Sequence, residues 1–265
     1  MTLPYKIHFT GHFLPWHRWF VQAYETALKD KCGYTGASPY WNWTQEPDPA
    51  SGLGGWGDLA RDFAVPDGGF SNLHLSYPAP HTLRRNFTLQ PFLGLDKPAG
   101  MAPFFPDPAK QANSSFTAPE VEKMVGGFVG DFVGFQQYFE QYEGAHSSIH
   151  TIMGGDLGGT CPINAPQNCT PGPTWSVNEP LFFLHHAMVD KVWDDWQHRN
   201  VANFWQFHGG TVEEIANFTS YTQYPNGAPP FLNFFSKIPA DGMFPEVSIA
   251  DVMDTTGGYL CYVYE

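Results

Sequence analysis

Most of the eleven histidines in this chain of 265 residues fall into three groups. The groups contain His8, His12 and His17, then His146 and His150, and finally His185 and His186. His146 and His150 are four positions apart, so a helix would present both imidazoles on one face, within reach of one metal ion. Such a pair also arises by chance in helices that bind no metal. The two further groups favour a metal centre, because imidazole is a ligand for copper and zinc.

The segments that carry these histidines have helical patterns. Apolar residues recur at spacings of three and four over residues 16–31, and Cys32-Gly33 then predicts a helix end. Further helical patterns cover residues 119–142, 146–153 and 180–200. Residues 36–118 are rich in Gly, Pro, Asp and Asn, which predicts a long irregular excursion, and the tyrosine-rich residues 259–264 are a candidate strand.

Composition and charge exclude several classes of partner. The net charge is −13 with only 13 Lys and Arg residues, whereas nucleic acids and anionic membrane surfaces need clustered positive charge. No apolar stretch approaches the length of about 18 residues that spans a membrane. A hydrophobic content of 42% is enough for one core, which predicts a single domain over residues 1–265. We therefore expect small-molecule partners, no nucleic acid and no membrane.

Three motifs, taken in order along the chain, resemble the signatures of one family. The string HFTGHFLPWHR at residues 8–18, followed by Glu25, resembles the copper A signature of tyrosinases, catechol oxidases and molluscan hemocyanins. Residues 179–190 resemble the copper B signature, with Glu179 in place of an Asp. His146-Ser-Ser-Ile-His150, followed by two glycines, matches the remaining copper B pair, and the aromatic run at residues 40–43 also matches. The chain is thus identified as a member of this family of type 3 copper proteins.

The resemblance implies a mainly α fold, in which a four-helix antiparallel bundle surrounds a dinuclear copper site, with long irregular loops and a few short strands. The copper ligands that it implies are His8 and His17 at copper A, and His146, His150 and His186 at copper B. His12 and His185 match positions that bind no metal in the family, and we expect both to be histidines of the core or the pocket wall. The remaining histidines are expected on the surface or in loops, and these are His74, His81, His198 and His208.

The resemblance also implies roles for side chains beside the ligands. Arg18 and Asp190 are expected to form a buried ion pair between the two copper helices, with exposed helix positions as the alternative. Phe182 is expected to pack against a ligand imidazole.

Residues next to the copper B ligands bear on the choice of phenol. Ser147 and Thr151 follow the first two of these ligands, at positions that tune the preference between monophenols and diphenols in the family. Members active on monophenols often carry Asn at the first position, working with a Glu that holds a water, and Gln137 is near where that Glu would lie. We therefore expect oxidation of o-diphenols or o-aminophenols to exceed hydroxylation of monophenols.

One family ligand has no counterpart in this sequence. Family members carry a first copper A histidine well upstream of the position of His8, where this sequence has only seven residues. With no export signal at its start either, the sequence is expected to begin inside a longer precursor, and a natural paralogue that has shed the segment is the alternative. The available substitutes are His12, His74 and His81, and none is at a matching position. We expect copper A to be weak, because even an outer-shell change costs about 10- to 100-fold in metal affinity.

The implied function is oxidation of o-diphenols to o-quinones, with small phenols and O2 as partners and copper as the cofactor. A copper-deficient pseudoenzyme that keeps the fold is one alternative, and a hemocyanin-like oxygen carrier is another. A zinc hydrolase is disfavoured because no Glu lies inside the His146–His150 motif, where a general base is needed.

Cysteines and glycosylation motifs predict a secreted protein. Asn-x-Ser/Thr sequons occur at Asn42, Asn86, Asn113, Asn168 and Asn217, and the four cysteines form an even set. Four cysteines allow three pairings, of which we prefer Cys161 with Cys169 and Cys32 with Cys261. A zinc site is disfavoured because no CxxC spacing occurs.

Overall fold

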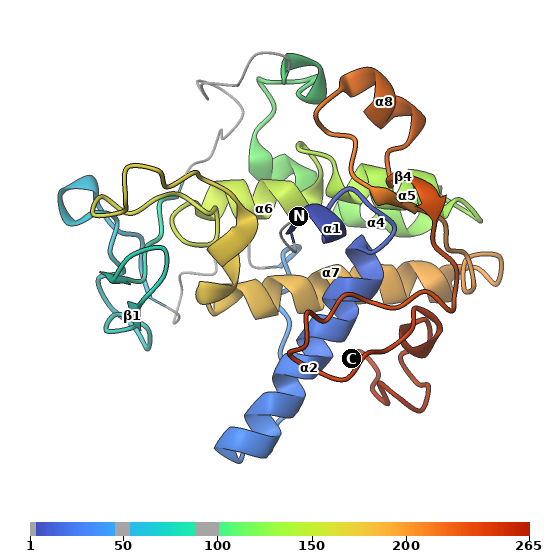
Figure 1. Ribbon diagram of the computed structural model, residues 1–265, viewed down its shortest axis with the longest axis horizontal. Helices are drawn as coiled ribbons and strands as arrows, with labels where there is room; N and C mark the ends of the chain where they lie inside the picture. Colours follow the sequence, from blue (N-terminus) through green and yellow to red (C-terminus); the bar gives the residue numbers. More distant parts are fainter. Residues whose placement is uncertain (1–3, 46–53, 88–100) are drawn as a thin grey trace.

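The computed structural model describes residues 4–45, 54–87 and 101–265 (Figure 1). The α-helices are α1 (Pro4–Ile7), α2 (Phe13–Cys32), α4 (Ala118–Gly127), α5 (Phe132–Glu140), α6 (Ala145–Met153), α7 (Leu181–Arg199) and α8 (Phe218–Gln223). Short 3-10 helices are η1 (Leu59–Arg61), η2 (Ala102–Phe104), η3 (Ala112–Phe116), η4 (Pro173–Asn178) and η5 (Ala250–Val252). Two antiparallel ribbons pair β1 (His74–Leu75) with β2 (His81–Thr82), and β3 (Gly210–Val212) with β4 (Ala228–Phe231). The predicted mainly helical fold with a few short strands is confirmed.

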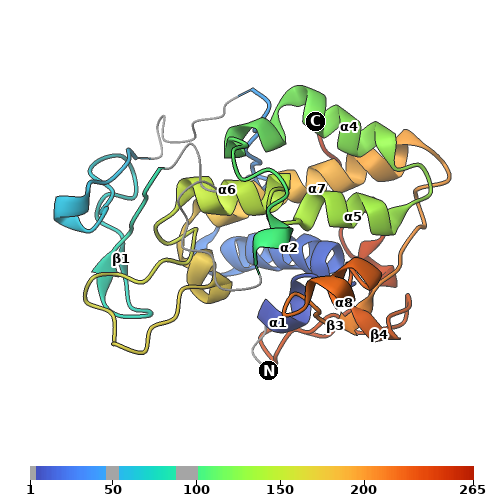
Figure 2. The same ribbon diagram turned by 90° about the horizontal axis from the view of Figure 1, so that it is seen from above.

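The helices α2 and α7 form the centre of the fold, and Figure 1 shows α2 running across α7. Both contribute fully buried tryptophans to the core, Trp19 from α2 and Trp193 and Trp196 from α7. The end of α2 is where the sequence predicts it, because Gly33 takes a left-handed φ of 68° and donates its N–H to the carbonyl of Lys29. α6 lies beside α7 in both views (Figures 1 and 2). None of the described helices is long and apolar enough to cross a membrane.

The predicted helix over residues 119–142 is two helices in the structure, α4 and α5. The chain leaves the helical conformation after Gly127, and Gly130 has a left-handed φ of 70°. Asp131 then begins α5, because its side chain accepts a hydrogen bond from the N–H of Gly134 at 2.9 Å. The indole N–H of Trp196 donates to the carbonyl of Phe128 at 3.0 Å and so fixes the connection to α7. The sequence analysis missed this break because the apolar spacing continues through it. Glycine adopts the left-handed conformation of the connection at little cost.

The preferred disulfide pairing is half right. Cys161 and Cys169 are bonded, as predicted. The pairing of Cys32 with Cys261 is wrong, since both are free, exposed thiols. Cys32 is the last residue of α2, whose exposed end projects beyond the other helices in Figure 1. Cys261 closes a turn of the C-terminal tail, where its N–H donates to the carbonyl of Gly257.

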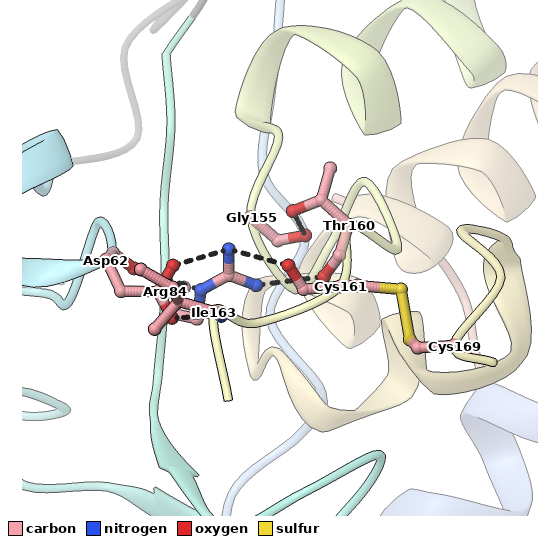
Figure 3. The surroundings of a disulfide bond; sticks show 7 residues. All are labelled: Asp62, Arg84, Gly155, Thr160, Cys161, Ile163 and Cys169. Carbon is pink, nitrogen blue, oxygen red and sulfur yellow. Dashed lines mark hydrogen bonds and ion pairs between the residues drawn. A yellow bond between two sulfur atoms is a disulfide. The ribbon is translucent and has the colours of Figure 1, made fainter. Parts of the chain in front are cut away.

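The Cys161–Cys169 loop is fastened to the long excursion by Arg84 (Figure 3). The guanidinium of Arg84 donates to the carbonyl of Thr160 at 2.8 Å and to that of Cys161 at 3.3 Å. It also pairs with the carboxylate of Asp62 at 3.1 Å. Two loops that are far apart in the sequence are therefore tied together at one guanidinium.

The tyrosine-rich tail forms no strand, contrary to the sequence prediction. Its tyrosine side chains, rather than a backbone ladder, bond it to the rest of the protein. Tyr262 and Tyr264 both donate their hydroxyls to the carboxylate of Asp190 on α7, the latter at 2.6 Å. Burial raises the pKa of both phenols well above the ordinary value, and the charge of Asp190 adds to the rise. They therefore remain protonated donors at neutral pH.

The same carboxylate forms a fully buried ion pair with Arg18 of α2. Arg18 also donates to the side-chain oxygen of Gln197 at 2.9 Å, and its guanidinium lies 3.7 Å from the ring centroid of Trp193. This is the contact that the sequence analysis expects between α2 and α7, and the exposed alternative is excluded because both side chains are buried.

The Asp190→Asn substitution is expected to lower the free energy of unfolding by about 3–5 kcal/mol, because it leaves Arg18 buried without a carboxylate. The matched control is Asp195→Asn on the same helix, which removes a partly exposed pair with Lys191 and should cost about 0–1 kcal/mol. Urea unfolding followed by tryptophan fluorescence measures both. Equal losses in the free energy of unfolding would show that the buried pair stabilises the fold no more than the partly exposed pair does.

Candidate metal centre

The structure brings the predicted ligand histidines together from α2, α6, α7 and the segment after α1. One group contains His146, His150, His185 and His186, and another contains His8, His17 and His146. Within each group the candidate ligand atoms all lie within 4.8 Å of one another. His146 belongs to both groups, so the two candidate sites are adjacent.

Backbone carbonyls orient two of these imidazoles. The Nδ1 of His17 lies 2.8 Å from the carbonyl oxygen of Phe13, and the Nδ1 of His150 lies 2.9 Å from that of Leu157. A carbonyl oxygen only accepts, so Nδ1 carries the proton in both rings and Nε2 presents a lone pair. The Nε2 atoms of His150 and His186 are 3.2 Å apart. With the proton of His186 on Nδ1, both Nε2 lone pairs face each other, which is the arrangement that a metal ion requires.

Several ring nitrogens in the cluster are buried without a hydrogen-bond partner among the described residues. They are His17 Nε2, both nitrogens of His146, both of His185, and His186 Nδ1. Buried polar atoms in native proteins are nearly always paired, so a group of unpaired ones calls for a missing partner. A cation that accepts nitrogen lone pairs satisfies this requirement, and the residues present therefore fit a metal centre.

Burial also sets the charge state of the cluster. It lowers the pKa of His17, His146 and His186 well below the ordinary value, and neighbouring histidines lower it further. Burial lowers the pKa of His150 to about 4. These rings are neutral at pH 7, which is the form that binds a metal.

Aromatic rings enclose the cluster. Phe182 lies 4.2 Å from the ring centroid of His186, which is the contact expected from the sequence. His186 itself stacks on His17 with centroids 4.1 Å apart, and Phe13 meets His146 edge to face at 4.8 Å. This packing immobilises the imidazoles and excludes water from one side of the centre.

His185 is closer to the centre than the sequence analysis implies. It is fully buried, its ring lies 5.3 Å from that of Trp43, and it belongs to the larger histidine group. The larger histidine group of the described residues therefore holds one more candidate imidazole than the motif predicts.

The other histidines lie outside both groups. His12 is buried at the start of α2, and burial lowers its pKa to about 4. His74 and His208 are exposed, as expected, and His198 contacts Asp194 on the surface of α7. His81 differs from the expectation, because its side chain is buried and bonds Asp156 at 2.8 Å. None of the three suggested substitutes joins a described metal group.

A second buried ion pair supports the start of α7. Glu179 and Arg85 are both fully buried and form two parallel hydrogen bonds of 2.8 Å. Glu179 also accepts from the N–H of Leu181 at 3.2 Å, which satisfies a free donor of the first helical turn. The sequence analysis found Glu179 but missed Arg85, because the acid alone does not show which of 13 Lys and Arg residues pairs with it.

Two cavities reach the histidines. The first, called the acidic cavity below, has a volume of about 270 Å³, and its lining includes His8, His146, His150, Glu140 and Glu213. The second, called the apolar cavity, has about 290 Å³, and its lining includes His8, His17, Trp16, Phe20 and Phe182. Each is close in volume to the smaller pockets that bind one-ring ligands.

The side chains expected to tune the choice of phenol line the acidic cavity, but their hydroxyls are occupied. Ser147 donates to the backbone carbonyl of Glu140 at 2.8 Å, and Thr151 donates to that of Ser147 at 2.8 Å. Gln137 bonds Tyr221 and is not among the residues of the cavity wall. Glu140, on the same helix as Gln137, lines the cavity instead, as does Glu213. The motifs contain no signal for Glu140 or Glu213.

Comparison with known proteins agrees with the geometry. A family model described as the common central domain of tyrosinase matches residues 2–199. The tyrosinase-like protein phomQ1 of Diaporthe leptostromiformis is 29% identical over 97% of this chain and 64% of its own length. The N-acetyl-6-hydroxytryptophan oxidase ivoB of Emericella nidulans is 28% identical over 100% of this chain and 78% of its own length.

A solved structure has the same fold. The polyphenol oxidase of Thermothelomyces thermophila, as the mutant G292N, superposes with a TM-score of 0.69 at 25% identity, over 99% of this chain and 74% of that one. The chain spans just under two thirds of the length of phomQ1. With the matched domain covering most of the sequence and the histidine cluster in place, the chain belongs to the tyrosinase family.

Proposed function

We propose that this chain is the catalytic part of a copper oxidase that converts o-diphenols to o-quinones with O2. The observation that carries the proposal is the cluster of buried, neutral imidazoles at His17, His146 and His186, each with a ring nitrogen that has no hydrogen-bond partner among the described residues. The proposed ligands are His8 and His17 at copper A, and His146, His150 and His186 at copper B. Two diphenols and one O2 give two quinones and two waters.

Bound copper supplies the electron transfer from diphenol to O2, and the chain supplies the surroundings. The Phe13 and Leu157 carbonyls hold the protons of His17 and His150 on Nδ1, away from the metal side. Phe182 keeps the His186 ring in place and dry. The acidic cavity brings a single aromatic ring to His146 and His150.

A copper-deficient form is the second candidate. Among the described residues, the smaller histidine group holds His8 and His17 and shares His146 with the larger group. We expect the site of the smaller group to bind its ion more weakly for that reason. The disulfide and the sequons favour secretion, since disulfides persist in oxidising compartments.

The first test is the copper and zinc content per chain, followed by oxygen uptake with 4-tert-butylcatechol on the same sample. Two coppers per chain and quinone formation are the expected results. One copper or none, without oxygen uptake, favours the copper-deficient candidate. Two coppers with reversible oxygen binding and no quinone would instead identify an oxygen carrier.

Removal of one ligand histidine should weaken copper binding at one of the two proposed sites. His150→Gln is expected to lower copper affinity at copper B by more than the roughly 10- to 100-fold that an outer-shell change costs. Copper per chain after dialysis against a weak chelator measures this loss. His208→Gln, at an exposed position outside both groups, is the control and should keep the wild-type copper content. Equal copper content in both variants would remove His150 from the ligand set.

The preference for diphenols is expected to depend on Ser147. Its hydroxyl donates to the Glu140 carbonyl and so has no proton left to donate to a phenol in the cavity. Ser147→Asn should raise monophenol hydroxylation relative to diphenol oxidation by several-fold, because the longer amide reaches into the cavity that Glu140 also lines. The ratio of initial rates with 4-tert-butylphenol and 4-tert-butylcatechol measures the change. An unchanged ratio would mean that another residue sets the preference.

A further inference from the structure

The acidic cavity carries two carboxylates, and none of the described residues that line it is Lys or Arg. Glu140 is 1% exposed, and its carboxylate accepts from the N–H of Phe9 at 2.6 Å and from the amide of Gln136 at 3.2 Å. Burial raises the pKa of Glu140 well above its ordinary value, and Glu213 adds to the rise. The carboxylate of Glu140 therefore already accepts hydrogen bonds from within the protein.

Glu213 differs from Glu140, because no hydrogen bond or ion pair joins it to another described residue. It is partly buried and directly follows β3. That strand is fixed to the start of the chain, since the N–H of Gly11 donates to the carbonyl of Gly210 at 2.9 Å. A Cβ on Gly11 would come within 2.9 Å of the Gly209 backbone, so the two segments are in close contact. Figure 2 shows α1, β3 and β4 together at this corner. The hairpin therefore holds Glu213 in the cavity wall.

The cavity is a ligand site on evidence that is independent of its acids. His146 lines it, is 4% exposed, and has both ring nitrogens without a hydrogen-bond partner. Phe9, Leu157, Pro173 and Ile215 supply apolar wall that suits an aromatic ring. A ring that reaches the histidines would place its substituent among the remaining wall residues, which include Glu213.

On the basis of the proposed function, we propose that Glu213 selects diphenols that carry a protonated amine on a short chain, by pairing its carboxylate with the ammonium group. A neutral or anionic substituent would leave this carboxylate unpaired when the substrate displaces its water, which is unfavourable. Burial raises the pKa of Glu213 to about 7, because desolvation disfavours the charged carboxylate. A cation relieves that penalty.

The acid lies outside the residues that the family model matches. The family model ends at residue 199, whereas β3 and Glu213 follow it. The histidine cluster lies within the matched residues, apart from this wall. The chemistry and the choice of substituent are thus supplied by different parts of the chain.

The test compares three ligands that are not oxidised, phenethylamine, 2-phenylethanol and 3-phenylpropanoate, by calorimetric titration of the purified protein at about pH 8, where Glu213 is mostly ionised. Phenethylamine is expected to bind about tenfold or more tightly than 2-phenylethanol, and 3-phenylpropanoate more weakly than either. Glu213→Gln should reduce the preference for the amine to less than about threefold, while Glu213→Asp should keep part of it.

The matched control is Glu214→Gln, which makes the same change of charge one residue away and does not touch the cavity wall. It should keep the wild-type preference. Equal binding of amine and alcohol by the wild-type protein, or an equal loss of preference in both Gln variants, would overturn the role of Glu213. Amine preference without turnover of 4-methylcatechol would overturn only the proposed function. Turnover without amine preference would overturn only this inference.

Discussion

The buried contact between Arg18 and Asp190 determines how α2 lies across α7, and the metal centre depends on that crossing. Arg18 follows His17 directly, and Asp190 comes one helical turn after His186. The ion pair therefore places the two imidazoles against each other, with ring centroids 4.1 Å apart. Apolar side chains could provide equal stability, but they would let the helices slide, whereas a fully desolvated pair accepts one register. The tyrosines that also bond Asp190 hold the tail to the same point.

Burial of the histidine cluster has two opposite effects. It keeps the rings neutral and dry, which prepares their lone pairs for a metal ion. It also leaves ring nitrogens without partners among the described residues, which costs stability in the absence of the ion. Metal binding and folding are therefore coupled, since an ion that binds only the folded chain stabilises it.

The side chains around the centre come from two parts of the chain. The residues matched by the family model contain the clustered histidines, Phe182, and the Glu179–Arg85 pair that supports the start of α7. The residues beyond position 199 contribute the hairpin that carries Glu213 and the tail that bonds Asp190. The segment that carries Glu213 is therefore separate from the helices that carry the histidines.

The sequence by itself predicted most of the helices, the family and five of the clustered histidines, because these depend on local spacing and on motifs that are contiguous in the chain. It did not determine that a helix breaks between α4 and α5, since apolar periodicity continues through glycines that only the packed structure uses as a stop. It failed for Cys32 and Cys261, because pairing depends on where distant segments end in space. Arg85, His185 and Glu213 acquire their roles only when loops and helices far apart in the sequence meet. Long-range packing, which no local pattern encodes, decided those contacts.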